Sequence, residues 1–125
     1  MTGTWERLAN VRLTDRQDGD IEIDLIALIH NLGVVVIETK GGTISYNGQT
    51  FRQSDRSGNR SINPDDQALK NLYAFKVFLR DRWSYGNIKS EWMLAFPFSH
   101  FSKNVDIRGV ERDRIIDHND VQFWR

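Results

Sequence analysis

Residues 19–42, with the sequence GDIEIDLIALIHNLGVVVIETKGG, contain two apolar runs joined by a short polar connection. The run 21–30 is rich in Ile and Leu, and the run 34–40 is dominated by β-branched residues, which fit a pleated strand better than a helix. The connection around Gly33 is short enough to be a tight turn. The block therefore predicts two neighbouring antiparallel strands.

Charged side chains recur at alternate positions in these two strands. Alternation places Glu22 and Asp24 on one face of the first strand, and Glu38 and Lys40 on one face of the second. Counting back from the turn puts Asp24 broadly opposite residues 38–40. We therefore expect three carboxylates and one amine to converge on a patch of an otherwise apolar sheet.

Such a patch has two interpretations, and the residues alone leave both open. One is a cross-strand ion pair on a solvated face of the sheet. The other is a magnesium site, because burying several charges is costly unless they are compensated, and carboxylate oxygens suit this cation. The metal would stabilise charge on a phosphodiester and activate a water. A lysine there would orient the water, assist its deprotonation or neutralise the oxyanion.

The next segment, residues 41–62, is predicted to bend and to form a hairpin. Gly41-Gly42 marks a bend or a close approach of two backbones. Strands at 43–46 and 49–51 flank Asn47-Gly48, a pair that favours a type I′ turn because both central residues need a positive φ. Residues 54–62 (SDRSGNRSI) are polar and predict a loop.

One helix dominates the second half of the chain. It is predicted to begin at Asn63, with Pro64 in the first helical position, Leu69 in its apolar stripe and Gly86 as its C-terminal cap. Further strands are expected at 8–13, 91–98 and 114–117. This order predicts an α/β (α+β) fold in which a mixed central β-sheet is flanked by a helix.

The composition indicates one ordinary globular domain, residues 1–125, with 39% hydrophobic and 27% charged residues. The absence of cysteine excludes a disulfide framework and a thiolate metal site. No apolar run is long enough to cross a bilayer and the N-terminus has no signal-peptide pattern, which fits a cytoplasmic protein. The polar run 117–120 suits a surface turn better than a metal cluster.

Charge is balanced over the whole chain but not along it. With 17 basic and 17 acidic side chains, the net field of the domain offers no steering toward nucleic acid. Residues 52–89 carry eight basic and four acidic side chains, an excess that fits either a solvated face or contacts with phosphates. Arg52, Arg56 and Arg60, before the helix, are the residues that we expect to contact a nucleic-acid backbone.

The charged residues also resemble a known motif. Glu22-Ile23-Asp24, thirteen intervening residues and Glu38-Thr39-Lys40 resemble the core motif of the PD-(D/E)XK nuclease superfamily. The sequence of residues 19–42 is more specific and resembles the nuclease-related domain (NERD) family, in which an EID block and an E-x-K motif precede a Gly-rich turn. The helix opening at residues 63–67 (NPDDQ) is similar to that family's layout. The resemblance covers roughly residues 8–117 and implies a restriction-endonuclease-like core.

The resemblance implies a metal-dependent nuclease that hydrolyses phosphodiester bonds in DNA, or in RNA, with Mg²⁺ or Mn²⁺. It implies that Asp24 and Glu38 are metal ligands, with the backbone carbonyl of Thr39 as a third, and that Lys40 is the catalytic lysine. Gln67 would be a helix residue that faces the site. Glu22 would bind through water or to a second metal ion.

Two departures from the family pattern leave an alternative function open. Ile23 stands where the superfamily name has Pro. The family usually begins with a helix that carries a glutamate, whereas seven residues precede Leu8 and Glu6 is the candidate among them. The alternative is a catalytically inactive nuclease-fold module for nucleic-acid binding or protein assembly. With either function, we expect the domain to form a homodimer that covers an exposed edge or face, or to be part of a larger protein. A protein–protein interaction domain without metal affinity is a third interpretation.

Overall fold

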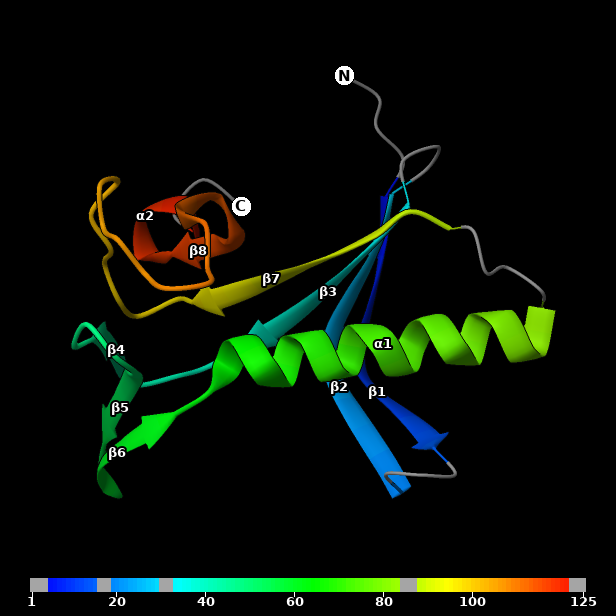
Figure 1. Cartoon of the computed structure of the whole chain (residues 1–125), viewed down its shortest axis with the longest axis horizontal. Helices are drawn as coiled ribbons and strands as arrows, with labels where there is room; N and C mark the ends of the chain where they lie inside the picture. Colours follow the sequence, from blue (N-terminus) through cyan, green and yellow to red (C-terminus); the bar gives the residue numbers. More distant parts are fainter. Residues whose placement is uncertain (1–4, 16–18, 30–32, 84–87, 122–125) are drawn as a thin grey trace.

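The computed structural model of the chain describes residues 5–15, 19–29, 33–83 and 88–121. Within these ranges the chain forms eight strands, one long helix and two short helical segments (Figure 1). The strands are β1 (Trp5–Asp15), β2 (Gly19–Ile29), β3 (Gly33–Thr39), β4 (Thr43–Tyr46), β5 (Phe51–Asp55), β6 (Gly58–Ile62), β7 (Ser90–Phe96) and β8 (Ile115–Asp117). The helices are α1 (Pro64–Trp83), the 3₁₀ segment η1 (Arg112–Arg114) and α2 (His118–Val121).

The main sheet has five strands in the order β1-β2-β3-β7-β8. Its first three strands are antiparallel neighbours, whereas β3, β7 and β8 run parallel to one another. A parallel pair needs a crossover connection, and the segment that contains α1 supplies it between β3 and β7 (Figure 1). The mixed sheet and single main helix confirm the predicted fold class and are consistent with a restriction-endonuclease-like fold.

The helix packs across one face of this sheet. Ala74 and Phe75 of α1 form a core with Ile26, Val34 and Val36, which come from β2 and β3. The predicted start of the helix is confirmed, since α1 begins at Pro64 with acidic residues in its first turn. The predicted cap at Gly86 lies outside the described residues.

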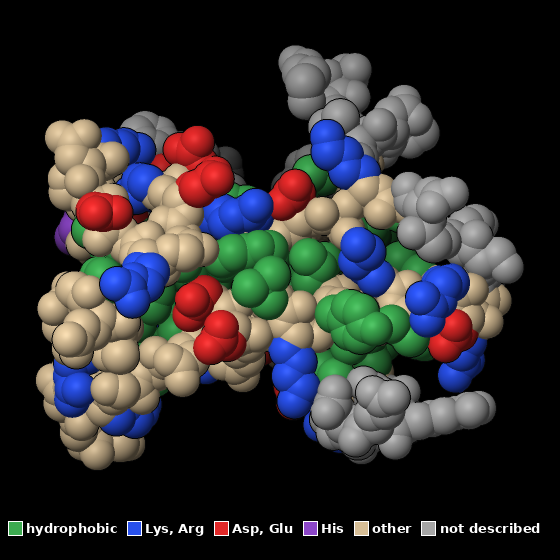
Figure 2. Space-filling model, viewed as in Figure 1, with side chains coloured by type: hydrophobic (Ala, Val, Ile, Leu, Met, Phe, Trp, Pro, Cys, Tyr) green, Lys and Arg blue, Asp and Glu red, His purple; other side chains and the backbone are tan. Residues whose placement is uncertain are grey.

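The apolar stripe predicted for α1 is wrong at Leu69. Leu69 is 45% exposed and Tyr73 is 70% exposed, so neither belongs to the core. Hydrophobic side chains are visible on this face of the molecule, beside lysines and arginines (Figure 2). The buried line of the helix runs through Ala68, Asn71 and Phe75, because these positions face the sheet.

A second, smaller sheet follows β3, with the strand order β4-β5-β6. Its apolar side chains Ile44 and Phe51 pack with Phe96 and Phe101 in a second core. Residues 54–62, predicted as a loop, form most of the β5–β6 hairpin. The sequence did not predict this hairpin because the segment lacks the alternating apolar residues that indicate strands. Polar contacts between the two strands accompany their pairing.

The turn between β4 and β5 also differs from the prediction. Tyr46 pairs with Phe51, so the loop has four residues and not the two of a type I′ hairpin. Asn47 does not adopt a positive φ, since Asn10 is the non-glycine residue with a positive φ in the described ranges. The Oδ1 atom of Asn47 instead accepts hydrogen bonds from the backbone N–H groups of Gln49 and Thr50. This side-chain cap closes the longer loop.

The later strands lie where the sequence predicted them, as β7 and β8. None of the helices in the described ranges is long and apolar enough to cross a membrane.

Candidate active site

Asp24 lies where the ladder between β1 and β2 is interrupted. The pairing passes from Ala9 with Leu25 to Val11 with Ile23, and Asn10 between them has a φ of 53°. Ile23 and Ile26 pack in the same core, although regular alternation would place residues three apart on opposite faces. We infer that β2 turns at this point.

The side chain of Asp24 is bound to the end of β3. The ladder between β2 and β3 reaches Leu25 and Ile37 and does not include Asp24. The Oδ2 atom of Asp24 accepts a hydrogen bond of 3.0 Å from the backbone N–H of Thr39. The predicted position of Asp24 beside residues 38–40 is therefore confirmed.

Glu38 is almost completely buried, with 3% of its surface exposed. It alternates with Val34 and Val36, whose side chains pack against α1, so its carboxylate also points toward the helix. Its Oε1 atom accepts a hydrogen bond of 3.3 Å from Nδ2 of Asn71, and its Oε2 atom lies 3.3 Å from Nζ of Lys40. Lys40 is 23% exposed, so its ammonium group retains access to solvent.

The environment of Glu38 opposes its negative charge. Burial raises the pKa of the Glu38 carboxyl, and the charge of Asp24 raises it further. The charge of Lys40 and its hydrogen bond lower this pKa, but they do not offset the other two effects. The site therefore holds two carboxylates whose mutual repulsion one ammonium group balances only in part.

These residues fit a hard divalent cation by the chemistry of their donor atoms. Among the described residues, no group of three or more His, Cys, Asp and Glu side chains comes together as a metal-binding cluster. Magnesium, however, is typically held by one or two carboxylates and keeps several waters. Asp24 and Glu38 meet that requirement, and a cation would favour the charged form of Glu38, whose pKa is raised first by burial and then by the charge of Asp24.

Glu22 does not join this group. It pairs with Arg12 on β1, and its carboxylate lies 3.7 Å from the guanidinium group on an exposed surface. The sequence argument assumed that Glu22 and Asp24 continue on one face of a regular strand. The structure shows Arg12 as the partner of Glu22, and a role of Glu22 toward a metal ion stays a prediction.

The helix contributes Asn71 where the family pattern indicated Gln67. The side chain of Gln67 is exposed and makes no hydrogen bond to Asp24, Glu38 or Lys40. Asn71 lies one helical turn later, is 4% exposed and reaches Glu38 directly. The sequence contained one signal for this residue, a lone amide within an otherwise apolar helical stripe.

The three arginines expected at a nucleic-acid backbone have different surroundings. Arg52 on β5 donates hydrogen bonds to side chains of β6, and Arg60 on β6 forms an ion pair of 2.8 Å with Asp55. Arg56 lies in the turn between these strands, is exposed and has no polar partner within the described part of the chain. Arg52 and Arg60 thus lie on strands and not on the predicted loop.

The β5–β6 hairpin is connected to the segment that directly follows Lys40. Arg60 donates a hydrogen bond to Oε1 of Gln53, whose Nε2 atom donates in turn to the backbone carbonyl of Gly41. Gly42 has a φ of +69°, and a Cβ atom there would lie 2.7 Å from the carbonyl oxygen of Ser54. The predicted close backbone approach at these glycines is confirmed for Gly42.

A second buried carboxylate, Asp117 at the end of β8, has a different environment. It is 1% exposed, and its Oδ2 atom accepts hydrogen bonds from the backbone N–H of Phe101 and from Arg112, both at 3.0 Å. Its Oδ1 atom accepts from the backbone N–H groups of Asn119 and Asp120. The prediction of a surface turn at 117–120 was wrong, because Asp117 is the last residue of β8 and is buried, and 118–120 belong to α2.

Comparison with known proteins gives one match. The model of the nuclease-related domain family (NERD) matches residues 1–97, a range that extends from β1 to the end of β7 and includes Asp24, Glu38, Lys40 and Asn71. Neither the curated proteins nor the solved structures contain a match to the chain.

Proposed function

Because this chain belongs to the nuclease-related domain family, we propose that it is a metal-dependent nuclease that hydrolyses phosphodiester bonds in DNA or RNA. The observation that carries the proposal is the convergence of Asp24, Glu38 and Lys40 at the end of β3. A solvated ion pair is a poorer explanation, because Glu38 is buried at a raised pKa instead of being exposed to water.

Asp24 and Glu38 would hold Mg²⁺ or Mn²⁺, with the backbone carbonyl of Thr39 as a third donor. When bound, such a cation supplies stabilisation of the developing phosphate charge and a lowered pKa of a coordinated water. The hydrogen bond from the Thr39 N–H orients the Asp24 carboxylate, and the contact with Asn71 orients that of Glu38. Both acidic groups are thus held in place by the protein before any ligand arrives.

Lys40 would act on the nucleophile or on the phosphate. Its ammonium group can donate hydrogen bonds to an attacking water or to a phosphate oxygen, and can hold a proton at Nζ. If Glu38 served as a metal ligand, its 3.3 Å ion pair with Lys40 would weaken and the ammonium group would be free for the substrate. Partial exposure of Lys40 makes this possible without unfolding of the site.

Backbone contacts with nucleic acid would come from Arg52, Arg56 and Arg60, and Arg56 is the best placed of them. It can meet a phosphate without giving up a protein partner, whereas Arg60 would have to leave Asp55 and Gln53. Replacing Arg56 by glutamate is expected to weaken DNA binding and to reduce the dependence of the binding constant on salt by about one ion. Equal binding by the variant at low salt would exclude Arg56 from the interface.

The direct test is cleavage of supercoiled plasmid and of single-stranded DNA and RNA in Mg²⁺, Mn²⁺ or EDTA. We expect cutting that depends on the metal, that Lys40→Ala slows about 100- to 10,000-fold, and that Asp24→Ala reduces to the level in EDTA. Matched controls are Lys103→Ala and Asp106→Ala, two exposed residues outside the range matched by the family model, which should cut as the wild type does.

Two outcomes would contradict this proposal. Cutting that persists in both site variants would place the activity elsewhere or in a contaminant. A folded wild type that binds Mn²⁺ and cuts no nucleic acid would favour the inactive nuclease-fold module.

A further inference from the structure

We propose that Asn71, and not Gln67, is the residue of α1 that positions Glu38 for cation binding. This inference rests on the proposed metal site, and it names a residue whose role in that site neither the motif nor the family layout indicated.

The first argument is the burial of an amide where an apolar side chain would pack more favourably. Asn71 is 4% exposed, and its buried neighbours along the inner face of α1 are Ala68, Ala74 and Phe75. A buried amide costs free energy unless its polar atoms find partners. Its Nδ2 atom finds that partner in Glu38, 33 positions earlier in the chain, so the contact depends on how the helix lies on the sheet.

The second argument concerns what else could orient Glu38. The terminal torsion of a glutamate side chain is broad, so the plane of the carboxylate needs external contacts to define it. Lys40 provides one contact through a long, partly exposed side chain, and this is the contact that a cation would weaken. Asn71 is short and buried on a long helix, so its contact with Oε1 remains when Lys40 moves.

The two contacts also divide the carboxylate between them. Oε1 of Glu38 accepts a hydrogen bond from Asn71, and Oε2 lies beside the ammonium group of Lys40. The hydrogen bond from Asn71 therefore defines the orientation of the carboxylate. Residues that orient metal ligands in this way typically change metal affinity or activity by about 10- to 100-fold when they are removed. Gln67, exposed one turn earlier, makes no such contact.

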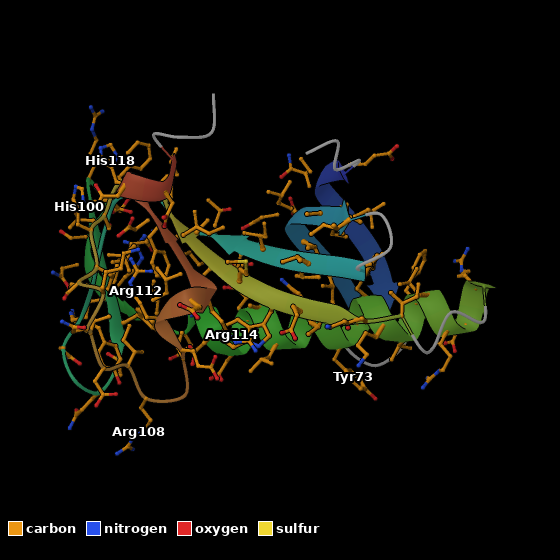
Figure 3. The ribbon with its side chains drawn as sticks, turned by 90° about the horizontal axis from the view of Figure 1, so that it is seen from above. Tyr73, His100, Arg108, Arg112, Arg114 and His118 are labelled. Carbon is orange, nitrogen blue, oxygen red and sulfur yellow. The ribbon has the colours of Figure 1, made fainter. Side chains whose placement is uncertain are left out.

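The test compares three single variants on the same helix, Asn71→Leu, Gln67→Leu and Tyr73→Leu. Tyr73 is the matched control because its side chain points away from the sheet (Figure 3). Titration calorimetry with Mn²⁺ alone should show about 10- to 100-fold weaker binding for Asn71→Leu, and about wild-type binding for the other two. Thermal unfolding without metal should show Asn71→Leu folded but less stable than the wild type, because Oε1 of the buried Glu38 loses its donor.

Cleavage kinetics over a range of Mn²⁺ concentrations, up to saturation, add a second readout. A positioning role predicts that Asn71→Leu recovers part of its kcat as Mn²⁺ is raised, with the KM for DNA unchanged. If Asn71→Leu does not fold, Asn71→Ala removes the same amide without adding an apolar group, and the same loss of Mn²⁺ affinity is expected.

The inference is overturned if Asn71→Leu and Asn71→Ala bind Mn²⁺ as the wild type does, or if Gln67→Leu loses as much affinity as they do. A wild type that binds no Mn²⁺ overturns it as well. A wild type that binds Mn²⁺ in an Asn71-dependent way but cuts no nucleic acid supports the positioning role and contradicts only the nuclease activity.

Discussion

Glu38 and Asp117 are both buried carboxylates in the same sheet, with only β7 between their strands, yet their pKa values shift in opposite directions. Burial raises the pKa of Glu38, and the charge of Asp24 adds to the effect. Burial also opposes the charge of Asp117, but hydrogen bonds from the backbone N–H groups of Phe101, Asp120 and Asn119, together with the charge of Arg112, lower its pKa below the ordinary value.

The difference shows that burial alone does not distinguish a structural carboxylate from a functional one. Asp117 has backbone donors and a guanidinium group on its two oxygens, so its charge ties the loop after β7 to the end of β8. Glu38 has one amide and one ammonium group, and it faces another acid. An incompletely compensated charge in a protein interior is a common mark of a binding site.

The largest effect is expected at the structural carboxylate. Asp117→Asn removes the charge that pairs with Arg112 and places an NH₂ group among backbone donors. We expect the free energy of unfolding to fall by about 3–5 kcal/mol, as when one partner of a buried ion pair is removed. Urea unfolding followed by circular dichroism measures this. A loss below about 1 kcal/mol, the size of an ordinary surface pair, would show that the Arg112 cluster is not a stabilising element.

A smaller effect of opposite sign is expected when metal is added. Mn²⁺ at a hundred times its dissociation constant should stabilise the wild type by about 2.7 kcal/mol, because it binds the folded state. The same addition should leave Glu38→Gln unchanged and should protect Asp117→Asn by as much as the wild type. Thermal unfolding with Mn²⁺ and with EDTA measures this, and equal protection of Glu38→Gln would remove Glu38 from the ligand set.

Without metal, Glu38→Gln should be more stable than the wild type at neutral pH, by about 1 kcal/mol. The substitution removes a buried charge that the fold compensates only in part, and it keeps an oxygen that can accept from Asn71. Urea unfolding in EDTA measures the difference, with Glu22→Gln as an exposed control. A clear destabilisation would instead favour an ion pair with Lys40 that contributes to the fold.

The smallest expected effects are changes with pH in the stability of the two variants relative to the wild type. The folded-state pKa of Glu38 is raised, so its protonated form contributes stability that is fully present below the ordinary glutamate pKa and is lost as pH rises through the raised value. The advantage of Glu38→Gln should therefore shrink as pH falls through that window.

Asp117 has the opposite linkage. Its folded-state pKa is lowered, so its contribution is present above the ordinary aspartate pKa and is lost as pH falls through the lowered value. The deficit of Asp117→Asn should thus shrink only at more acidic pH than the advantage of Glu38→Gln. Unfolding of the wild type and both variants across this range, in EDTA, measures the two changes. A single shared pH dependence would contradict the contrast between the two carboxylates.

Much of the site could be predicted because it depends on short-range patterns. Asp24 and Glu38 lie on two paired strands that are close in the sequence, and Lys40 directly follows the second strand, so the strand pattern was sufficient to bring them together. Asn63 and Pro64 carried the local signal for the start of α1. The metal and nucleic-acid roles of these residues stay predictions, to be decided by the experiments above.

The errors occurred where an element departs from regular geometry or is held by distant contacts. Glu22 was expected beside Asp24 from strand alternation, and the structure shows it paired with Arg12 of the neighbouring strand; its role toward a metal ion stays a prediction. The β5–β6 hairpin has too few apolar residues to show a strand period, and cross-strand contacts such as that of Arg60 with Asp55 accompany its pairing.

The sequence by itself determined the two strands of residues 19–42, the long helix and the motif that they carry, because hydrophobic period and turn residues act over a few positions. Only the tertiary structure decided which amide of the helix meets Glu38, and that Asp117 is enclosed by donors. Those choices depend on how α1 lies across β3 and on how the loop after β7 returns to β8. Contacts between residues distant in the chain depend on the packing of the whole sheet, so short sequence patterns do not predict which residues will meet.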